Sequence, residues 1–90
     1  MSTPDEIDEL REEILLTLHA ASSRGLPVEV VSRGLSRAGY TAPESLVHTQ
    51  LELLERKGKV RKISSALNPA AHRWSLTDDG HRLLAEEGLA

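Results

Sequence analysis

Residues 46–63 read LVHTQLELLERKGKVRKI, and the periodicity of this stretch changes at Gly58. Before the glycine, apolar residues recur at spacings of four and three, as they do along one face of a helix. These residues are Val47, Leu51 and Leu54. Gly58 suits the residue that ends a helix, because glycine readily adopts a left-handed conformation. The pattern predicts a helix over residues 42–57.

Beyond Gly58 the sequence predicts a β-hairpin over residues 59–77. Its two short segments with strand character are KVRKIS (59–64) and HRWSLT (72–77). Alternation in the second segment places Trp74 and Leu76 on one face, so we expect Trp74 to fill the core.

Three further helices are expected, over residues 4–22, 27–37 and 78–87. Apolar residues recur along each of them at helical spacings. The residue patterns also predict helix ends: capping boxes at Thr3 with Glu6 and at Thr41 with Glu44, a cap at Thr77, and a terminating glycine at Gly25.

The composition of the 90 residues fits a single small domain that is mainly α with a small β-hairpin, an α+β protein in the order ααα-ββ-α. The chain has no Cys and no Phe, which excludes disulfides and thiolate metal sites and favours a core of Leu, Val, Ile and Ala. No apolar run approaches the roughly 18 residues that a membrane span needs, and the acidic N-terminus is unlike a secretory signal. We therefore expect a cytoplasmic protein without a membrane partner.

The basic residues are concentrated in one stretch although the formal net charge is −3. Between positions 56 and 62 the chain places five of its eleven Lys and Arg: Arg56, Lys57, Lys59, Arg61 and Lys62. A partner within a Debye length of about 8–10 Å responds to such a local patch more than to the net charge. We expect the helix end and the hairpin to present these bases, with Arg73, as one continuous positive face.

Two runs of this sequence resemble the winged helix-turn-helix family. The first run is LVHTQLELLERKGKVRKI (46–63), with Val47, Leu51, Leu54, Glu55 and Gly58 at motif positions. The second is HRWSLTDDGHRLL (72–84), with Leu76, Thr77 and Gly80 at motif positions. The resemblance covers roughly residues 7–87 and is closest to small regulators of the multiple-antibiotic-resistance and phenolic-acid-repressor types, with a fainter likeness to short proteins of Mu-like prophages. Lys59 departs from the family pattern, which has an apolar residue there; its stem can lie over apolar neighbours while the ammonium reaches solvent.

The resemblance implies a small transcriptional regulator that binds double-stranded DNA, with the third helix in the major groove and the hairpin on the backbone or minor groove. The implied groove-facing residues are Ser45, His48, Thr49 and Glu52. The implied phosphate contacts are Arg56, Lys57, Lys59, Arg61, Lys62 and Arg73. Regulators of this family dimerise through terminal helices, so we expect a homodimer through the first helix, the last helix or both.

Other interpretations stay open at this point. Bases at a helix end and on a hairpin are often only a solvated face, and the third helix has acidic residues with no Lys or Arg before Arg56. The alternative is therefore a winged-helix module that binds protein rather than DNA, a scaffold or assembly factor. The four histidines lack metal-ligand spacing, and no arrangement supports nucleophilic catalysis. We expect no metal, no cofactor, no catalytic residue and no enzymatic activity.

Overall fold

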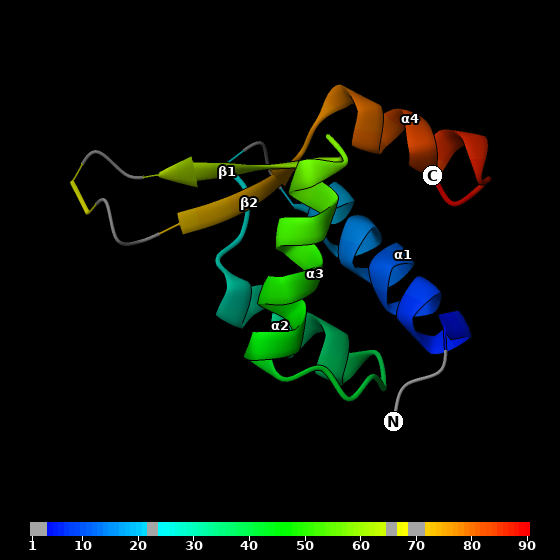
Figure 1. Ribbon diagram of the computed structural model, residues 1–90, viewed down its shortest axis with the longest axis horizontal. Coiled ribbons are helices and arrows are strands. Elements are labelled where there is room, and N and C mark those ends of the chain that lie inside the picture. The colour runs from blue at the N-terminus through cyan, green and yellow to red at the C-terminus, as the bar shows by residue number, and fades with distance from the viewer. Residues whose placement is uncertain (1–3, 22–23, 65–66, 69–71) are drawn as a thin grey trace.

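The computed structural model describes residues 4–21, 24–64, 67–68 and 72–90. These residues form four helices and one antiparallel hairpin, joined by turns. Their order, ααα-ββ-α, is the expected one, and the fold is a winged helix. The elements are α1 (Pro4–Ala20), α2 (Val28–Arg37), α3 (Glu44–Arg56), β1 (Val60–Ser64), β2 (His72–Leu76) and α4 (Asp78–Glu86). Figure 1 shows α1, α2 and α3 grouped together and the hairpin projecting from them to one side.

The apolar faces of the elements meet in one core, with α1 packed against α2, α3, α4 and β2. Val47, Leu51 and Leu54 of α3 face inward, as their spacing predicts. The other buried apolar residues are Leu10, Ile14, Leu15, Leu18, Val31, Leu35, Ala42, Val60, Trp74, Leu76 and Leu84. Burial of these side chains holds the helices and the base of the hairpin together, since apolar burial is the main favourable term in folding.

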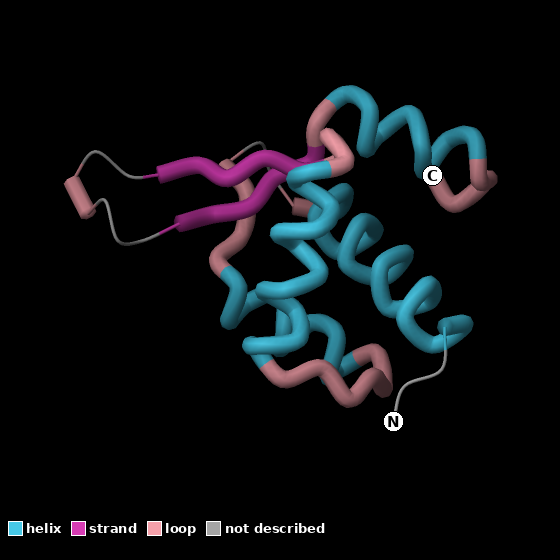
Figure 2. Tube along the Cα trace, viewed as in Figure 1, coloured by secondary structure: helices cyan, strands magenta, loops and turns pink. Residues whose placement is uncertain are grey.

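The hairpin is anchored at its base and extends beyond the helices, as the magenta strands in Figure 2 show. Val60 pairs with Leu76 at the base, and Ser64 pairs with His72 toward the tip. The other edge of β2 pairs with Leu26, whose N–H donates to the Trp74 carbonyl (2.9 Å) and whose carbonyl accepts from the Trp74 N–H (2.8 Å). This second neighbour helps to explain why Trp74, Ser75 and Leu76 are all buried.

The end of the first helix differs from the sequence expectation. The helix ends at Ala20 rather than residue 22, and Gly25 lies beyond it rather than at its terminus. Gly25 adopts a φ of +75° and passes so close to β2 that a Cβ atom would collide with the Trp74 carbonyl. Glycine is required there by the approach of two backbones and not by helix capping.

The predicted helix caps have different outcomes. Thr77 is confirmed, since its Oγ1 accepts from the Gly80 N–H (3.1 Å) at the start of α4. The predicted capping box of Thr41 is wrong: Pro43 occupies the capping position of α3, with no side-chain hydrogen bond. The turn before α3 is held instead by Ser32, whose hydroxyl donates to the Ala42 carbonyl (2.5 Å). Thr3 lies outside the described residues.

Candidate nucleic-acid interface

Helix α3 is positioned by its own buried face and by the turn that joins it to α2. In that turn Gly39 has a φ of +94°, and the Tyr40 N–H donates to the Leu35 carbonyl (3.0 Å). With its apolar residues inward, α3 presents a polar face to solvent. Exposed on this face are the residues for which the family resemblance implies DNA contacts: Ser45, His48, Thr49, Glu52 and, at the helix end, Arg56.

The polar groups on this face interact with one another. His48 Nδ1 lies 3.2 Å from Glu52 Oε1, and both side chains are about half exposed, at 46% and 49%. The Thr49 hydroxyl donates to the Ser45 carbonyl (2.9 Å). The His48–Glu52 pair was not predicted from the sequence, although a spacing of four residues on a helix brings two side chains together.

The charge of the α3 surface is acidic except at its end. Glu44 and Glu52 are exposed, and Glu55 is half-buried. Arg56 shares a small cleft of about 220 Å³ with Thr49, Glu52 and Glu55. Negative charge therefore surrounds the one base of the helix, which weakens the attraction of α3 alone for a polyanion.

Trp74 joins α3 to the hairpin. Its indole is only 1% exposed, so the expectation that it fills the core is confirmed. The His48 ring meets it edge-on, with 6.0 Å between ring centroids, and Lys62 Nζ lies 5.1 Å from the indole centroid. A cation–π contact of this kind holds the ammonium of Lys62 beside the exposed face of α3.

The register of the hairpin divides its bases between two faces. Lys62 lies opposite Trp74, whereas Arg61 lies opposite Ser75 and Arg73 opposite Ile63. Because side chains alternate along a strand, Arg61 and Arg73 share the face that Lys62 does not. The expectation of one continuous positive face is therefore wrong. Arg73 Nη1 donates to the Gly25 carbonyl (3.3 Å), and Arg61 lines a cleft with Asp78 and His81.

Lys57 and Lys59 line a cleft of about 340 Å³ formed by α1, the end of α3 and α4. Asp8, Glu12 and Glu87 line the same cleft, together with several leucines. Lys59 is half-buried there, which agrees with a stem lying over apolar neighbours. The structure thus does not bring these two lysines together with Arg61 and Arg73.

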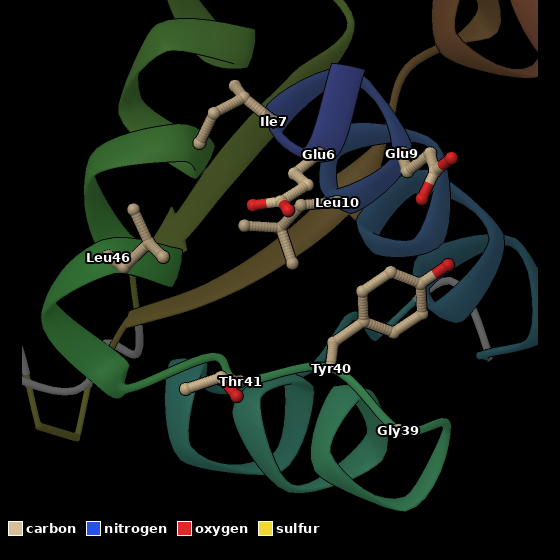
Figure 3. Close-up of a pocket in the computed structure, with 8 residues that line it drawn as sticks. All are labelled: Glu6, Ile7, Glu9, Leu10, Gly39, Tyr40, Thr41 and Leu46. Atoms are coloured by element: carbon tan, nitrogen blue, oxygen red, sulfur yellow. The ribbon is translucent and has the colours of Figure 1, made fainter. Parts of the chain in front are cut away.

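A separate pocket of about 290 Å³ lies between α1 and the turn before α3. Glu6, Glu9 and Tyr40 line it with apolar residues, and in Figure 3 the Tyr40 ring points from the turn toward α1. Desolvation raises the pKa of Tyr40 above its ordinary value, and the charges of Glu13, Glu9 and Glu12 raise it further. The pocket is acidic, so it adds nothing to an interface for DNA.

The described residues contain neither a membrane-spanning helix nor a cluster of metal-ligating side chains. No helix in those ranges is long and apolar enough to cross a membrane. No group of three or more His, Cys, Asp and Glu residues in the described chain gathers closely enough to hold a metal ion.

Comparison with known proteins gives matches among solved structures alone. No protein-family model matches the chain, and no curated protein does. The S. aureus MepR–DNA complex aligns with a TM-score of 0.71 at 23% identity, over 83% of this chain and 51% of that one. FabT of Streptococcus pneumoniae, solved in complex with DNA, aligns with a TM-score of 0.67 at 21% identity, over 89% and 50%.

The PcaV transcriptional regulator of Streptomyces coelicolor aligns with a TM-score of 0.70 at 23% identity, over 98% of this chain and 54% of that one. This chain therefore spans about half the length of the three proteins. At these identities the likeness concerns the fold. The resemblance to winged helix-turn-helix regulators is confirmed at that level.

Proposed function

We propose that this winged-helix chain binds double-stranded DNA as a small transcriptional regulator, with α3 in the major groove and the hairpin against the backbone. The observation that carries the proposal is the junction at Trp74, which holds Lys62 beside the exposed polar face of α3. Similar folds in MepR and FabT have been solved with DNA, which supports the same partner here. The chain acts by binding, not by catalysis.

In this arrangement α3 contributes recognition and the bases contribute affinity. Ser45 and Thr49 are exposed hydroxyls that suit phosphates or base edges, and the His48 ring suits a purine acceptor. Glu52 can only accept, for example from a cytosine amino group. Arg56, Arg61, Lys62 and Arg73 contact phosphates and position the protein. Lys57 and Lys59 have a smaller part because they lie in a cleft with acidic residues.

Bases on both faces of the hairpin suggest how it meets the duplex. A hairpin that lies flat on one strand uses one face, whereas a hairpin that enters a groove has a phosphate strand on each side. Lys62 on one face and Arg61 with Arg73 on the other fit the second arrangement. Substitutions on either face should therefore weaken binding.

The test compares Lys62→Glu with the double variant R61E/R73E in a duplex-binding titration. Arg82→Glu on α4 is the control for the single charge reversal at Lys62, since Arg82 is exposed and pairs with Asp79 of the same helix. Four phosphate contacts predict a log–log salt slope of about −3.6 for the wild type, and each lost contact removes roughly 0.9. Unchanged affinity and slope in both hairpin variants, with folding intact by circular dichroism, contradict the proposal.

A second candidate function is binding to a protein partner. It is favoured by the acidic surface of α3, where Glu44, Glu52 and Glu55 outnumber Arg56. The same titration separates the two candidates. Duplex affinity that falls steeply with salt supports DNA binding, and no duplex binding by the folded protein at low salt supports the protein-binding module.

We also propose a homodimer through α1, α4 or both. Leu16 of α1 and Leu83 of α4 are half-buried at the edge of the core, and Leu89 after α4 is 37% exposed. Apolar side chains in these positions would be covered by a second copy. A two-fold dimer would place two α3 helices on half-sites about 34 Å apart.

A further inference from the structure

Two histidines that are 62 positions apart in the sequence lie in contact on the surface. His19 is in the last turn of α1, and His81 is in the first turn of α4. Their Nδ1 atoms are 3.2 Å apart, and their rings meet edge-on, with centroids 5.3 Å apart and planes at 69°. Both residues are exposed, so an ion in solution has access to them.

The distance between the two nitrogens matches that of two adjacent ligands on one metal ion. Zinc–nitrogen bonds of about 2.0–2.1 Å place two nitrogens roughly 3.4 Å apart in a tetrahedral site and about 2.9 Å apart in an octahedral one. The observed 3.2 Å lies between these values. In the structure this contact is a hydrogen bond, in which one Nδ1 donates to the other. Metal binding replaces it: both rings must be neutral with the hydrogen on Nε2, and they must turn so that both Nδ1 lone pairs face the ion.

We propose that His19 and His81 together bind a divalent transition-metal ion, of the Zn²⁺, Ni²⁺ or Cu²⁺ class, with water completing the coordination. Two imidazole ligands favour this class over Mg²⁺ and Ca²⁺, which prefer oxygen. The affinity follows the general order for such sites, with Cu²⁺ above Ni²⁺ and Zn²⁺. With two protein ligands the site is weaker than a structural zinc site with four.

The fold fixes the backbone at both histidines before any ion binds. His19 follows Leu18, which is buried in the core, and the His81 N–H donates to the Thr77 carbonyl (3.0 Å). The start of α4 is fixed further by Gly80, which lies against the Lys59 carbonyl. Because folding has already brought the two rings together, an ion gains from both ligands at once and ties α1 to α4.

Two charged groups lie near the pair. Asp78 and Arg61 line a cleft of about 380 Å³ with His81. The guanidinium disfavours a bound cation and the carboxylate favours it. Neither histidine belongs to the exposed face of α3, so a metal titration tests this proposal separately from DNA binding.

The test is calorimetric titration of the tag-free protein with NiCl₂ and with ZnCl₂. The wild type should bind one ion per chain, and its Tm should rise by about 5–10 °C at ten times Kd. His19→Ala and His81→Ala should each weaken binding by roughly a hundredfold, because one ligand alone lacks the chelate gain. His19→Asn is a second, polar variant that keeps the size of the side chain closer to the original.

The matched control is His72→Ala, which removes a histidine outside the pair and outside the exposed face of α3. It should bind the ion as the wild type does. In NMR spectra, Cu²⁺ should broaden the ring protons of His19 and His81 first. Binding that survives His19→Ala and His81→Ala, or that disappears in His72→Ala, overturns the proposal, and so does the absence of binding at millimolar metal.

Discussion

At the scale of single residues, two helical glycines have opposite surroundings and should respond oppositely to alanine. A Cβ on Gly34 would meet only Thr17 Cγ2 at 3.5 Å, an ordinary contact. A Cβ on Gly80 would collide with the Lys59 carbonyl and with Leu76 Cδ2. Alanine favours a helix over glycine at both sites, so the collision at Gly80 decides the direction of the difference.

We therefore expect Gly34→Ala to raise the free energy of unfolding by about 0.5–1 kcal/mol. Gly80→Ala should lower it by about 1–3 kcal/mol, since the backbone at Lys59, just before β1, must shift to admit the methyl group. Urea denaturation monitored by circular dichroism measures both. Equal effects of the two substitutions would show that the close contact at Gly80 is relieved without cost.

Tyr40 offers a test of the acidic pocket. Its pKa is raised first by desolvation and then by Glu13, Glu9 and Glu12, so the phenolate should form above the ordinary value of 10.0. Because the folded-state pKa lies above the unfolded one, this group lowers stability as the pH rises through the interval between the two values. Tyr40 is the one tyrosine of the chain, so phenolate absorbance reports it alone.

The matched variant for this titration is Glu13→Gln. It should move the midpoint of Tyr40 only part of the way down, since desolvation is the larger cause. A wild-type midpoint at or below 10.0 would contradict the packing of Tyr40 against α1.

Sequence patterns could predict which residues of α3 face solvent, because the helical period assigns each position to a side. Alternation alone puts the adjacent residues Arg61 and Lys62 on opposite faces of a strand, but the face of Arg73 becomes clear only with the pairing register. Sequence patterns also could not find the His19–His81 contact, because 62 residues separate the two side chains. Contacts between distant segments depend on the packing of whole elements.

At the scale of elements, Thr77 and Thr41 provide a direct comparison, because the sequence predicted a cap at each. Thr77 Oγ1 accepts from the Gly80 N–H and donates to the Gly58 carbonyl (2.6 Å), so it connects α4 to the end of α3. Thr41 makes no cap, because α3 begins after Pro43.

Thr77→Ala should lower the free energy of unfolding by about 0.5–2 kcal/mol, the range measured for lost helix caps. Thr41→Ala should change it by less than about 0.5 kcal/mol, as expected for an exposed site. Thermal or urea denaturation of the pair measures the difference. A loss of stability in Thr41→Ala as large as that in Thr77→Ala would mean that the turn before α3 depends on Thr41.

The order of the elements could be predicted because each has its own local signal of period, glycine or cap. The pairing of Leu26 with β2 could not be predicted, since a single bridging residue shows no alternation of apolar and polar side chains. The early end of α1 could not be predicted either. Gly25 resembles a helix terminator in sequence, but its conformation allows its backbone to approach Trp74 closely.

At the scale of the whole molecule, the proposed dimer can be tested through Leu89. We expect sedimentation to give twice the 9.9 kDa of the chain, with a Tm that rises with protein concentration. Leu89→Glu should shift the mass toward the monomer by placing a charge in the interface. Leu67→Glu is the matched control, because Leu67 is 98% exposed near the tip of the hairpin. A monomeric wild type at high concentration would contradict the dimer.

The position of Trp74 has a consequence for spectroscopy. It is the chain's one tryptophan, enclosed where α3 meets the hairpin, with an imidazole and an ammonium beside its ring. Its excited state responds to both neighbours, so the emission of the unlabelled protein depends on how these two elements sit against each other. The protein thus has an intrinsic fluorescent probe at the junction of α3 and the hairpin, the two elements that we propose contact DNA.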